Sequence, residues 1–496
     1  MARAFSRSEV DPRRGFLSAS TVLLFFIGAV FVLGGSGRSD VTSLLLLRPL
    51  AVIVLAFGLL ALTTEGRRRF KPLWWLGGAS AGLVLLHLLP LPPAIWSALP
   101  GREIVSGIFD ATGIAKSWQP LSIDPFVGWN SLFAMVVPAA ALVIMAAGGE
   151  HVSGRMGKLL CILVFVSAFL GVLQVIGGPS NGFYLYRITN WESATGLFAN
   201  RNHNAMFLAC GFPLLAAWAS GLKGSAQQQR AYGFVAIIGA LALLPMILIT
   251  ESRGGILIGA IGLVAAMLIY RRPEQGAVVR GAKQVRGLVA AGLAVVATLV
   301  VMLLSLTSRG TAIDRLANES VAEDMRFAAL PHIWQMGLDA FPFGWGAGSF
   351  VTAYRIIEPD SLLSENYLNH AHNDLLEVFA EYGAFGLALI AAALIMYFIA
   401  AKRLWSLRAV LSRTQSPAAE RIRFGFVGLS ILGMLGVGSL FDYPLRIPSL
   451  MALAAVSAGF VVFALDAFRG HGYGERAVSN SRQRDEVGSI EEGSKA

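Results

Sequence analysis

The chain has 496 residues, of which 55% are hydrophobic and only 14% are charged, and its formal net charge is +10. A soluble protein of this size carries about 25% charged residues, so the composition excludes an ordinary soluble enzyme. The apolar residues come in runs of roughly 20, the length that a helix needs to cross the hydrocarbon layer of a membrane. We therefore expect an all-α polytopic membrane protein.

Apolar runs predict about twelve transmembrane helices. The first run follows a charged N-terminal segment, residues 1–15, and lacks a small-residue cleavage pattern, so it predicts a retained helix and not a removed signal peptide. In chain order the predicted spans are 16–34, 48–63, 73–91, 129–148, 157–177, 204–221, 233–250, 255–270, 287–306, 382–400, 424–440 and 448–467. The membrane domain then covers 16–470, and the polar residues 471–496 predict a disordered cytoplasmic tail.

Basic residues fall mainly on one side of this topology. With the N-terminus in the cytoplasm, the cytoplasmic segments hold 28 of the 40 Lys and Arg residues. Such an excess is typical of cytoplasmic loops, so both termini are predicted to be cytoplasmic. The net charge is therefore mostly a topology signal, and binding of nucleic acid has little support.

The external side receives the longer loops, about 92–128, about 178–203 and the largest, about 307–381, in which we expect short helices. The cytoplasmic loops are short and contain no Gly-rich loop that ends in Lys-Ser or Lys-Thr, so they carry no pattern for nucleotide binding.

Five polar clusters are all predicted to lie on the external side. Random placement would put such groups on both faces, so their coincidence indicates a functional site. The clusters are Thr195–Asn204, Glu251–Gly255, Asp324–Arg326 with the segment to Phe341, the stretch around His370 and His372, and Phe441–Pro448.

The stretch around His370 and His372 reads Asn-His-Ala-His-Asn-Asp and stands before a strongly apolar segment. Histidine is the side chain best suited to take a proton near neutral pH, so this stretch is a candidate for proton transfer. A two-histidine metal site is an alternative, but residues two apart on a helix point in different directions. A helix cap by Asn369 or Asn373 is a second, purely structural alternative.

Arginines accompany the histidines on the external side. Arg253 falls in a short turn between two helices, where an arginine that reaches to the interface is ordinary. However, its flanking glycine lets a ligand approach the backbone, and the guanidinium fork matches phosphate oxygens. Arg253, Arg326 and Arg201 together therefore form a candidate anion clamp.

Two further patterns precede the histidines. The Gly-rich segment Phe343–Gly348 predicts a tight turn that positions an aromatic side chain beside the site. Helical spacing of Phe327, Leu330, Trp334 and Leu338 predicts a face that packs on the membrane domain.

Taken in order, these motifs resemble the O-antigen ligase / O-antigen polymerase superfamily of bacterial membrane glycosyltransferases. The resemblance covers about 190–450. It rests on Thr195–Asn204, Ser252-Arg253-Gly254, Arg326 leading into Pro342–Gly346, His370-Ala371-His372-Asn373 and Glu381–Gly386.

The resemblance implies a reaction and a place for it. A glycan linked to polyprenyl pyrophosphate is transferred to an acceptor hydroxyl on the periplasmic side of the inner membrane, without a metal or another cofactor. In a ligase the acceptor is a sugar of the lipid A core; in an O-antigen or exopolysaccharide polymerase it is another lipid-linked glycan. Membrane lipids surround both substrates.

The resemblance also implies residue roles. His372 is the expected base, with His370 as second choice. Arg253 and Arg326, with Arg201, are expected to bind the pyrophosphate. The candidates for sugar or supporting contacts are Asn200, Asn202, Asn373 and Asp442.

A lipid-linked sugar flippase or transporter is a different class of function. Transporters usually place ionisable groups near the middle of the bilayer, and the predicted span interiors contain almost none beyond His87. The sequence therefore favours an enzyme.

Overall fold

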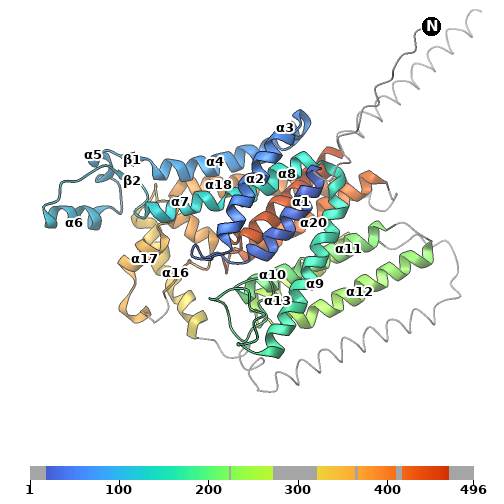
Figure 1. Cartoon of the computed structure of the whole chain (residues 1–496). Helices are drawn as coiled ribbons and strands as arrows, with labels where there is room; N and C mark the ends of the chain where they lie inside the picture. The colour runs from blue at the N-terminus through green and yellow to red at the C-terminus, as the bar shows by residue number, and fades with distance from the viewer. Residues whose placement is uncertain (1–17, 223–224, 272–320, 364–366, 409–415, 468–496) are drawn as a thin grey trace, which may run out of the picture.

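The computed structural model describes residues 18–222, 225–271, 321–363, 367–408 and 416–467. This part of the chain is mostly helical, and its one small sheet pairs β1 with β2 in antiparallel register (Figure 1). The elements of the first half are α1 (Ala19–Leu33), α2 (Leu44–Ala61), α3 (Thr64–Arg69), α4 (Lys71–Leu88), β1 (Pro90–Leu91), α5 (Pro93–Trp96), α6 (Glu103–Thr112), β2 (Gln119–Pro120), α7 (Pro125–Ala134), α8 (Val136–Gly148), η2 (Glu150–Val152) and α9 (Ser153–Gly177).

The second half continues the helical bundle. Its elements are α10 (Arg201–Ala209), α11 (Gly211–Gly221), α12 (Ala226–Leu248), α13 (Arg253–Ile269), α16 (Val321–Asp339), α17 (Phe350–Ile357), η3 (Asp360–Leu362), α18 (Asp374–Ser406), α20 (Pro417–Gly438), η4 (Pro444–Arg446) and a last helix, Pro448–Ala467.

Eight helices among the described residues are long and apolar enough to cross a membrane. Each overlaps a predicted span, which supports the prediction of a mostly helical, polytopic membrane protein. The eight are Leu44–Ala61, Pro125–Gly148, Glu150–Gly177, Arg201–Gly221, Gln227–Leu248, Asp374–Ser406, Pro417–Gly438 and Pro448–Ala467.

The count of about twelve spans is not reached in the described residues. The predicted spans 16–34 and 255–270 form the shorter apolar helices α1 and α13. The predicted span 73–91 forms α4, which is not among the eight. The predicted span 287–306 lies outside the described residues, as do the N-terminal segment 1–15 and the tail 471–496.

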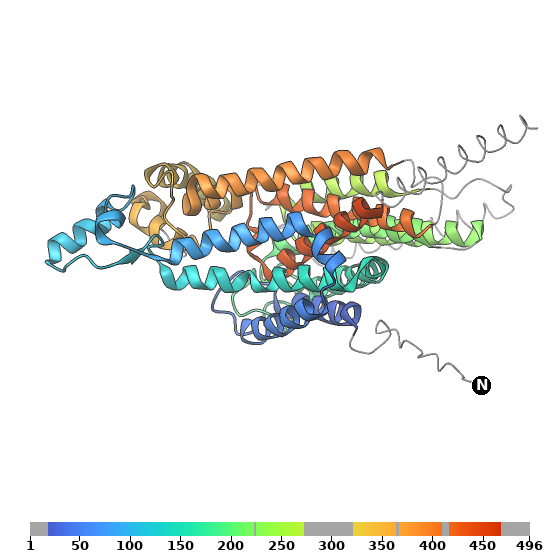
Figure 2. The same ribbon diagram turned by 90° about the horizontal axis from the view of Figure 1, so that it is seen from above.

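Apolar side chains fill the centre of the bundle, where α1, α2, α8 to α11, α13, α20 and the last helix pack together. Its aromatic centre includes Phe31 and Phe207, whose rings lie 4.5 Å apart. Figure 2 shows α18 (orange) along the length of the bundle. Only 11% of the most apolar window of α18 is buried inside the protein, so this helix presents an apolar surface to its surroundings, as a membrane helix does.

Ion pairs gather at one end of the bundle. Arg69 pairs with Glu65, with Glu150 at 2.9 Å and with Asp466 at 2.8 Å, and Arg421 also pairs with Glu150. We call these five residues the Arg69 cluster. They come from three segments predicted to be cytoplasmic and from the end of the last helix, so the structure brings together segments that the topology places on one side.

Two predicted external loops meet at the end of α4 that is farther from the Arg69 cluster. Residues 90–120, with α5 and α6, extend from the bundle in Figure 1. The fully buried Arg102 donates to the carbonyl oxygens of Leu121 (2.7 Å) and Gly344 (3.2 Å), and its guanidinium lies against Trp345. The Arg102 side chain thereby links this arm to the Gly-rich turn.

The prediction of a tight turn in the Gly-rich segment is confirmed by the positive φ angles of Gly344, Gly346 and Gly348. The aromatic side chain of the turn, Trp345, belongs to the same buried cluster as Ala371, which stands between His370 and His372. Trp345 is 3% exposed and donates from Nε1 to the carbonyl oxygen of Met336 (2.7 Å), so it is a core residue.

The predicted packing face of α16 is wrong. Phe327, Trp334 and Leu338 are all exposed, whereas the buried side of the helix consists of Ala329, Ile333, Met336 and, just beyond its end, Ala340. Small and branched residues form the closer contact here, and the larger aromatic side chains remain outside, although Trp334 stacks on Phe379 at 4.8 Å.

Candidate active site

The loop between α20 and the last helix is the meeting point of the predicted polar clusters. Its Asp442 contacts Asn202 at the start of α10 and His372 before α18. At its other end, Arg446 contacts Glu377 of α18. The loop itself thus contacts the cluster around Asn202 and the cluster around His372. Arg201, beside Asn202, also pairs with Glu251 at 3.0 Å, so four of the five predicted clusters are joined. The fifth contributes Arg326, whose charge acts on His372.

Asp442 is fully buried and is the centre of this arrangement. Its Oδ2 accepts a hydrogen bond from Nδ2 of Asn202 (2.8 Å), and its Oδ1 accepts one from the backbone N–H of Tyr443 (2.9 Å). The same Oδ1 lies 3.3 Å from Nδ1 of His372 and 3.6 Å from Nε2 of His203. We call Asp442, Asn202, His203, His372 and Tyr443 the Asp442 cluster.

The ionisation of Asp442 is set by these histidines. Burial alone would raise the pKa of the carboxyl group, but His203 and His372 outweigh burial and hold the pKa of Asp442 well below its ordinary value. Asp442 is therefore an anion at neutral pH and can orient and stabilise an imidazolium.

His372 shows two features of a functional residue. Its φ of 49° lies in the left-handed region, which is uncommon for a residue other than glycine and is often found at functional sites. Burial, together with the charges of Arg326 and His370, lowers the pKa of His372, although Asp442 acts in the opposite direction. A neutral imidazole at neutral pH can accept a proton.

The ring of Tyr443 packs among three histidines. Its centroid lies 4.4 Å from that of His370, 4.9 Å from that of His372 and 5.1 Å from that of His203. Burial and the neighbouring Asp442 raise the pKa of Tyr443 to about 12, so its hydroxyl stays protonated at neutral pH. The tyrosine is thus a fixed spacer that sets the positions of the imidazoles.

A second buried network holds His370. Nδ1 of His370 lies 2.8 Å from Oε1 of Glu377, and the backbone N–H of Ala371 donates to Oε2 of the same carboxylate (2.8 Å). Arg446 contacts Glu377 at 3.1 Å, Glu381 at 3.4 Å and Asp374 at 3.5 Å. Burial would lower the pKa of Arg446, but the three carboxylates raise it, so the guanidinium remains charged.

The positions of the three predicted clamp arginines differ. Arg201 is paired with Glu251, another residue with positive φ (54°). Arg253 is exposed and is the first residue of α13, after the N-cap Ser252. Arg326 is half-buried in α16 and near enough to His372 and Tyr443 to affect both electrostatically.

Three helices begin at this site. α10, α13 and α18 have Asn200, Ser252 and Asn373 as their respective N-caps, and each cap side chain accepts a backbone hydrogen bond. Helix N-termini carry partial positive charge and unpaired N–H groups, which favour anions. The arrangement can therefore attract a phosphate group even before the arginines are considered.

The predicted asparagine contacts divide into two kinds. Asn200 and Asn373 cap helices, so the structural alternative raised for Asn373 is confirmed; its Nδ2 also donates to the carbonyl oxygen of Leu440 (3.0 Å). Asn202 instead bonds Asp442. The expectation of supporting contacts thus fits Asn202 and Asp442 best.

Sequence reasoning assigned no role to His203, Tyr443, Arg446 or the carboxylates of α18. One signal was present, because Asp374, Glu377 and Glu381 recur at intervals of three and four residues and so share one helix face. Such an acidic stripe at the start of an apolar helix predicts a buried cation opposite it. His203 and Tyr443 gave no comparable signal.

No group of three or more His, Cys, Asp or Glu side chains that could hold a metal ion occurs within the described parts of the chain. The residues that surround Asp442 are instead joined to one another by hydrogen bonds and ion pairs.

A family model described as O-antigen ligase matches residues 238–391. This match supports the O-antigen ligase and polymerase superfamily for the chain. The matched segment contains Arg253, Arg326, His370 and His372, whereas Asp442 lies beyond it. No curated protein matches the chain. The expectation of this superfamily, which rested on short motifs in a fixed order, is thereby confirmed.

Proposed function

We propose that the chain is a membrane glycosyltransferase of the O-antigen ligase type. It moves a glycan from a polyprenyl-pyrophosphate carrier to an acceptor hydroxyl, with a sugar of the lipid A core as the first candidate acceptor. One observation carries the proposal: a buried histidine of lowered pKa, His372, lies 3.3 Å from the buried carboxylate of Asp442, where three helices begin.

In the proposed reaction His372 removes the proton of the acceptor hydroxyl. The hydroxyl oxygen forms a bond to the anomeric carbon of the donor sugar, while the bond from that carbon to the pyrophosphate oxygen breaks. The polyprenyl pyrophosphate leaves with the electron pair. Asp442, fixed by Asn202, orients the imidazole and stabilises the positive charge that it gains.

The leaving pyrophosphate requires positive charge near the membrane edge. Arg253 and Arg326 supply it in the proposal, since the guanidinium fork matches phosphate oxygens and keeps its charge. Arg201, which is paired with Glu251, positions the α10 and α13 termini rather than adding a free charge. Fixed arginines and helix N-termini would make a metal unnecessary.

We further propose that this site faces the periplasm, with both termini in the cytoplasm and the chain in the inner membrane. The distribution of Lys and Arg supports this orientation, since 28 of 40 belong to the segments on the other side. The donor glycan would then meet the site after its transfer across the membrane.

A transfer assay with purified protein and lipid-linked donor tests the proposal. We expect a new glycosidic bond without an ion gradient or nucleotide and in excess EDTA. Movement of the lipid-linked glycan across the bilayer without bond formation would instead favour a flippase. Loss of activity in EDTA with recovery in Mg²⁺ or Mn²⁺ would reject the arginine clamp.

Gene deletion followed by gel analysis of the glycans distinguishes the acceptors. Loss of all long chains from the lipid A core supports a ligase. Cores capped with a single repeat support the polymerase, the second candidate within the superfamily. Loss of an exopolysaccharide with normal lipopolysaccharide identifies a third acceptor.

A further inference from the structure

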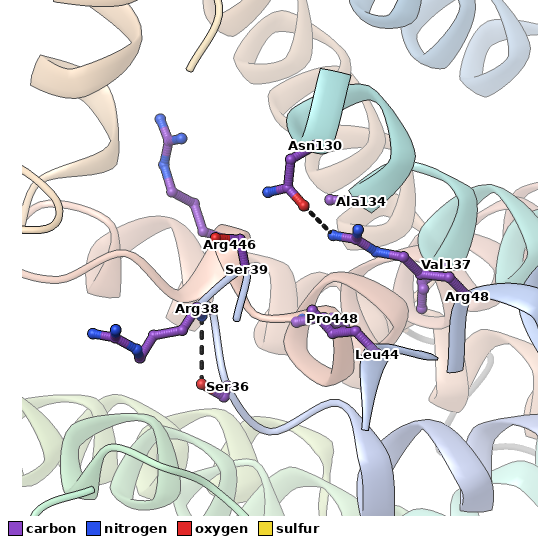
Figure 3. A pocket seen from close by; sticks show the side chains of 11 residues that line it. Ser36, Arg38, Ser39, Leu44, Arg48, Asn130, Ala134, Val137, Arg446 and Pro448 are labelled. Atoms are coloured by element: carbon purple, nitrogen blue, oxygen red, sulfur yellow. Dashed lines mark hydrogen bonds between the residues drawn. The ribbon is translucent and has the colours of Figure 1, made fainter. Parts of the chain in front are cut away.

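A small cavity lies beside the end of the loop Phe441–Pro448 (Figure 3). Its volume is about 30 Å³, and its polar lining comes from the α1–α2 turn, from α2, from α7 and from the loop before the last helix. The residues that supply this lining are Ser36, Arg38, Ser39, Arg48, Asn130 and Arg446.

The α1–α2 turn is a fixed wall of the cavity. The backbone N–H of Gly35 donates to the hydroxyl of Tyr186 (2.6 Å), and a Cβ atom at Gly35 would lie 2.1 Å from the carbonyl oxygen of Leu197. Ser43 also closes the turn by donating to the carbonyl oxygen of Leu33 (2.6 Å). Only glycine permits this close approach, so the backbone of the turn that lines the cavity is held in place by its neighbours.

Two of the three arginines in the lining are neutralised by carboxylates. Arg38 forms a bidentate pair with Asp40, at 2.9 and 3.0 Å. Arg446 is held by the carboxylates of α18. Both guanidinium groups therefore already have anionic partners within the chain.

Arg48 differs from these two arginines. It is half-buried in the membrane span Leu44–Ala61, and its Nη2 donates to the neutral Oδ1 of Asn130 (2.6 Å). Among the residues that the structure describes, no carboxylate forms an ion pair with Arg48. A cation within a membrane helix is costly unless it is paired or hydrated, and it often marks a binding site.

We propose that this cavity binds a phosphate group through Arg48. A guanidinium binds phosphate oxygens in a bidentate manner, and anionic lipid headgroups bring phosphate groups to the membrane edge. The volume of about 30 Å³ has room for about two water molecules, so it fits phosphate oxygens and excludes a sugar ring. The rest of the ligand would extend past the exposed Ser39.

The loop Phe441–Pro448 runs from the neighbourhood of Arg253 to this cavity. The ring of Phe441 packs on Gly254, the residue after Arg253. A Cβ atom at Gly254 would lie 2.3 Å from this ring. Arg446 and Pro448, at the other end of the loop, line the cavity. Arg253 and the cavity thus lie at opposite ends of this loop, and the inference does not depend on glycan transfer.

A binding measurement on the detergent-purified full chain tests the proposal. Dihexanoyl phosphatidylglycerol represents a lipid headgroup, and glucose 6-phosphate represents a phosphorylated glycan. We expect at least one of them to bind and Arg48→Gln to weaken this binding about ten- to a hundredfold, the value of hydrogen bonds to a charged group. The control Lys116→Gln, which removes an external positive charge paired with Asp110, should bind as the unmodified chain does.

Asn130→Asp separates a binding role of Arg48 from a structural one. The new carboxylate would take the place of the amide oxygen that contacts Arg48. It would form an ion pair with the guanidinium and so compete with a bound phosphate. We expect binding to fall as in Arg48→Gln, while the unfolding temperature stays equal or rises.

Each outcome decides the proposal. Binding of phosphatidylglycerol alone supports a headgroup site, and binding of glucose 6-phosphate supports a site for a phosphorylated glycan. Failure of both probes to bind, or binding that neither Arg48→Gln nor Asn130→Asp weakens, overturns it. Because no donor is present, a chain without transferase activity would give the same binding result.

Discussion

The Arg69 cluster and the Asp442 cluster both join distant segments of the chain. They differ in how deeply their charged groups are buried and in the partners of those groups. In the Arg69 cluster, each of the three carboxylates meets an arginine, and the side chains are 18–59% exposed. In the Asp442 cluster the carboxylate is fully buried, and both ring nitrogens of His203 lack a hydrogen-bond partner among the described residues.

The difference teaches what each cluster can do. Partly exposed ion pairs hold segments together and contribute little to stability. Buried polar groups with unused hydrogen-bonding capacity are costly, and they are common where ligands bind or protons move. The following predictions test whether chemistry belongs to the Asp442 cluster alone.

The largest expected effect comes from His372→Ala. Transfer should fall about 10²- to 10⁴-fold, the usual contribution of a positioned general base. The measurement is the rate of glycan transfer at saturating donor. His370→Ala is the matched variant; if it is inactive while His372→Ala is active, the base is His370, which Glu377 orients.

Asp442→Asn should have the next largest effect. The substitution keeps the shape of the side chain but removes the charge beside His372, so transfer should fall about 10- to 100-fold. The apparent KM for the donor should change little. A transfer rate within twofold of the original would show that Asp442 supports the loop only.

The pH dependence of transfer gives a third test. His372 must be unprotonated to act as a base, and burial lowers its pKa from 6.5. We therefore expect a constant rate between pH 7 and 8 and a fall of about tenfold per pH unit below the lowered pKa. An acid limb with its midpoint at or above pH 7 would contradict this protonation state.

The smallest expected effect comes from Glu150→Gln in the Arg69 cluster. The variant loses the carboxylate that Arg69 and Arg421 share, yet partly exposed pairs contribute about 1 kcal/mol or less to the free energy of unfolding. Transfer should remain within twofold, and thermal unfolding in detergent should show a small shift. A tenfold loss of transfer would mean that the two clusters are coupled.

Much of the site was predictable because polar residues stand out against apolar spans. The sequence placed His372, Asp442 and Asn202 on one predicted face, and the structure joins them. Helix bounds were harder, since the spans predicted to begin at 48 and 129 begin at Leu44 and Pro125 in the structure. The packing face of α16 was missed because Ala329, Ile333 and Met336, and not the aromatic residues, form its buried side.

Other parts of the site required tertiary structure. Arg48 reads in the sequence as one basic residue in an apolar run, and only its contact with Asn130, 82 positions away, shows that its partner is neutral. In the same way, Tyr443 is unremarkable until three histidines surround its ring. Partner choice across long sequence distances is not encoded in local pattern.

Direct measurement of donor binding in His372→Ala and Arg253→Ala tests the central division of roles. In the proposed mechanism His372 acts on the acceptor, so His372→Ala should bind the polyprenyl-pyrophosphate donor with nearly unchanged affinity. Arg253→Ala should bind it about tenfold or more weakly, and Arg253→Lys should be intermediate because it keeps the charge but loses the fork. Loss of donor binding in His372→Ala with full binding in Arg253→Ala would contradict the account.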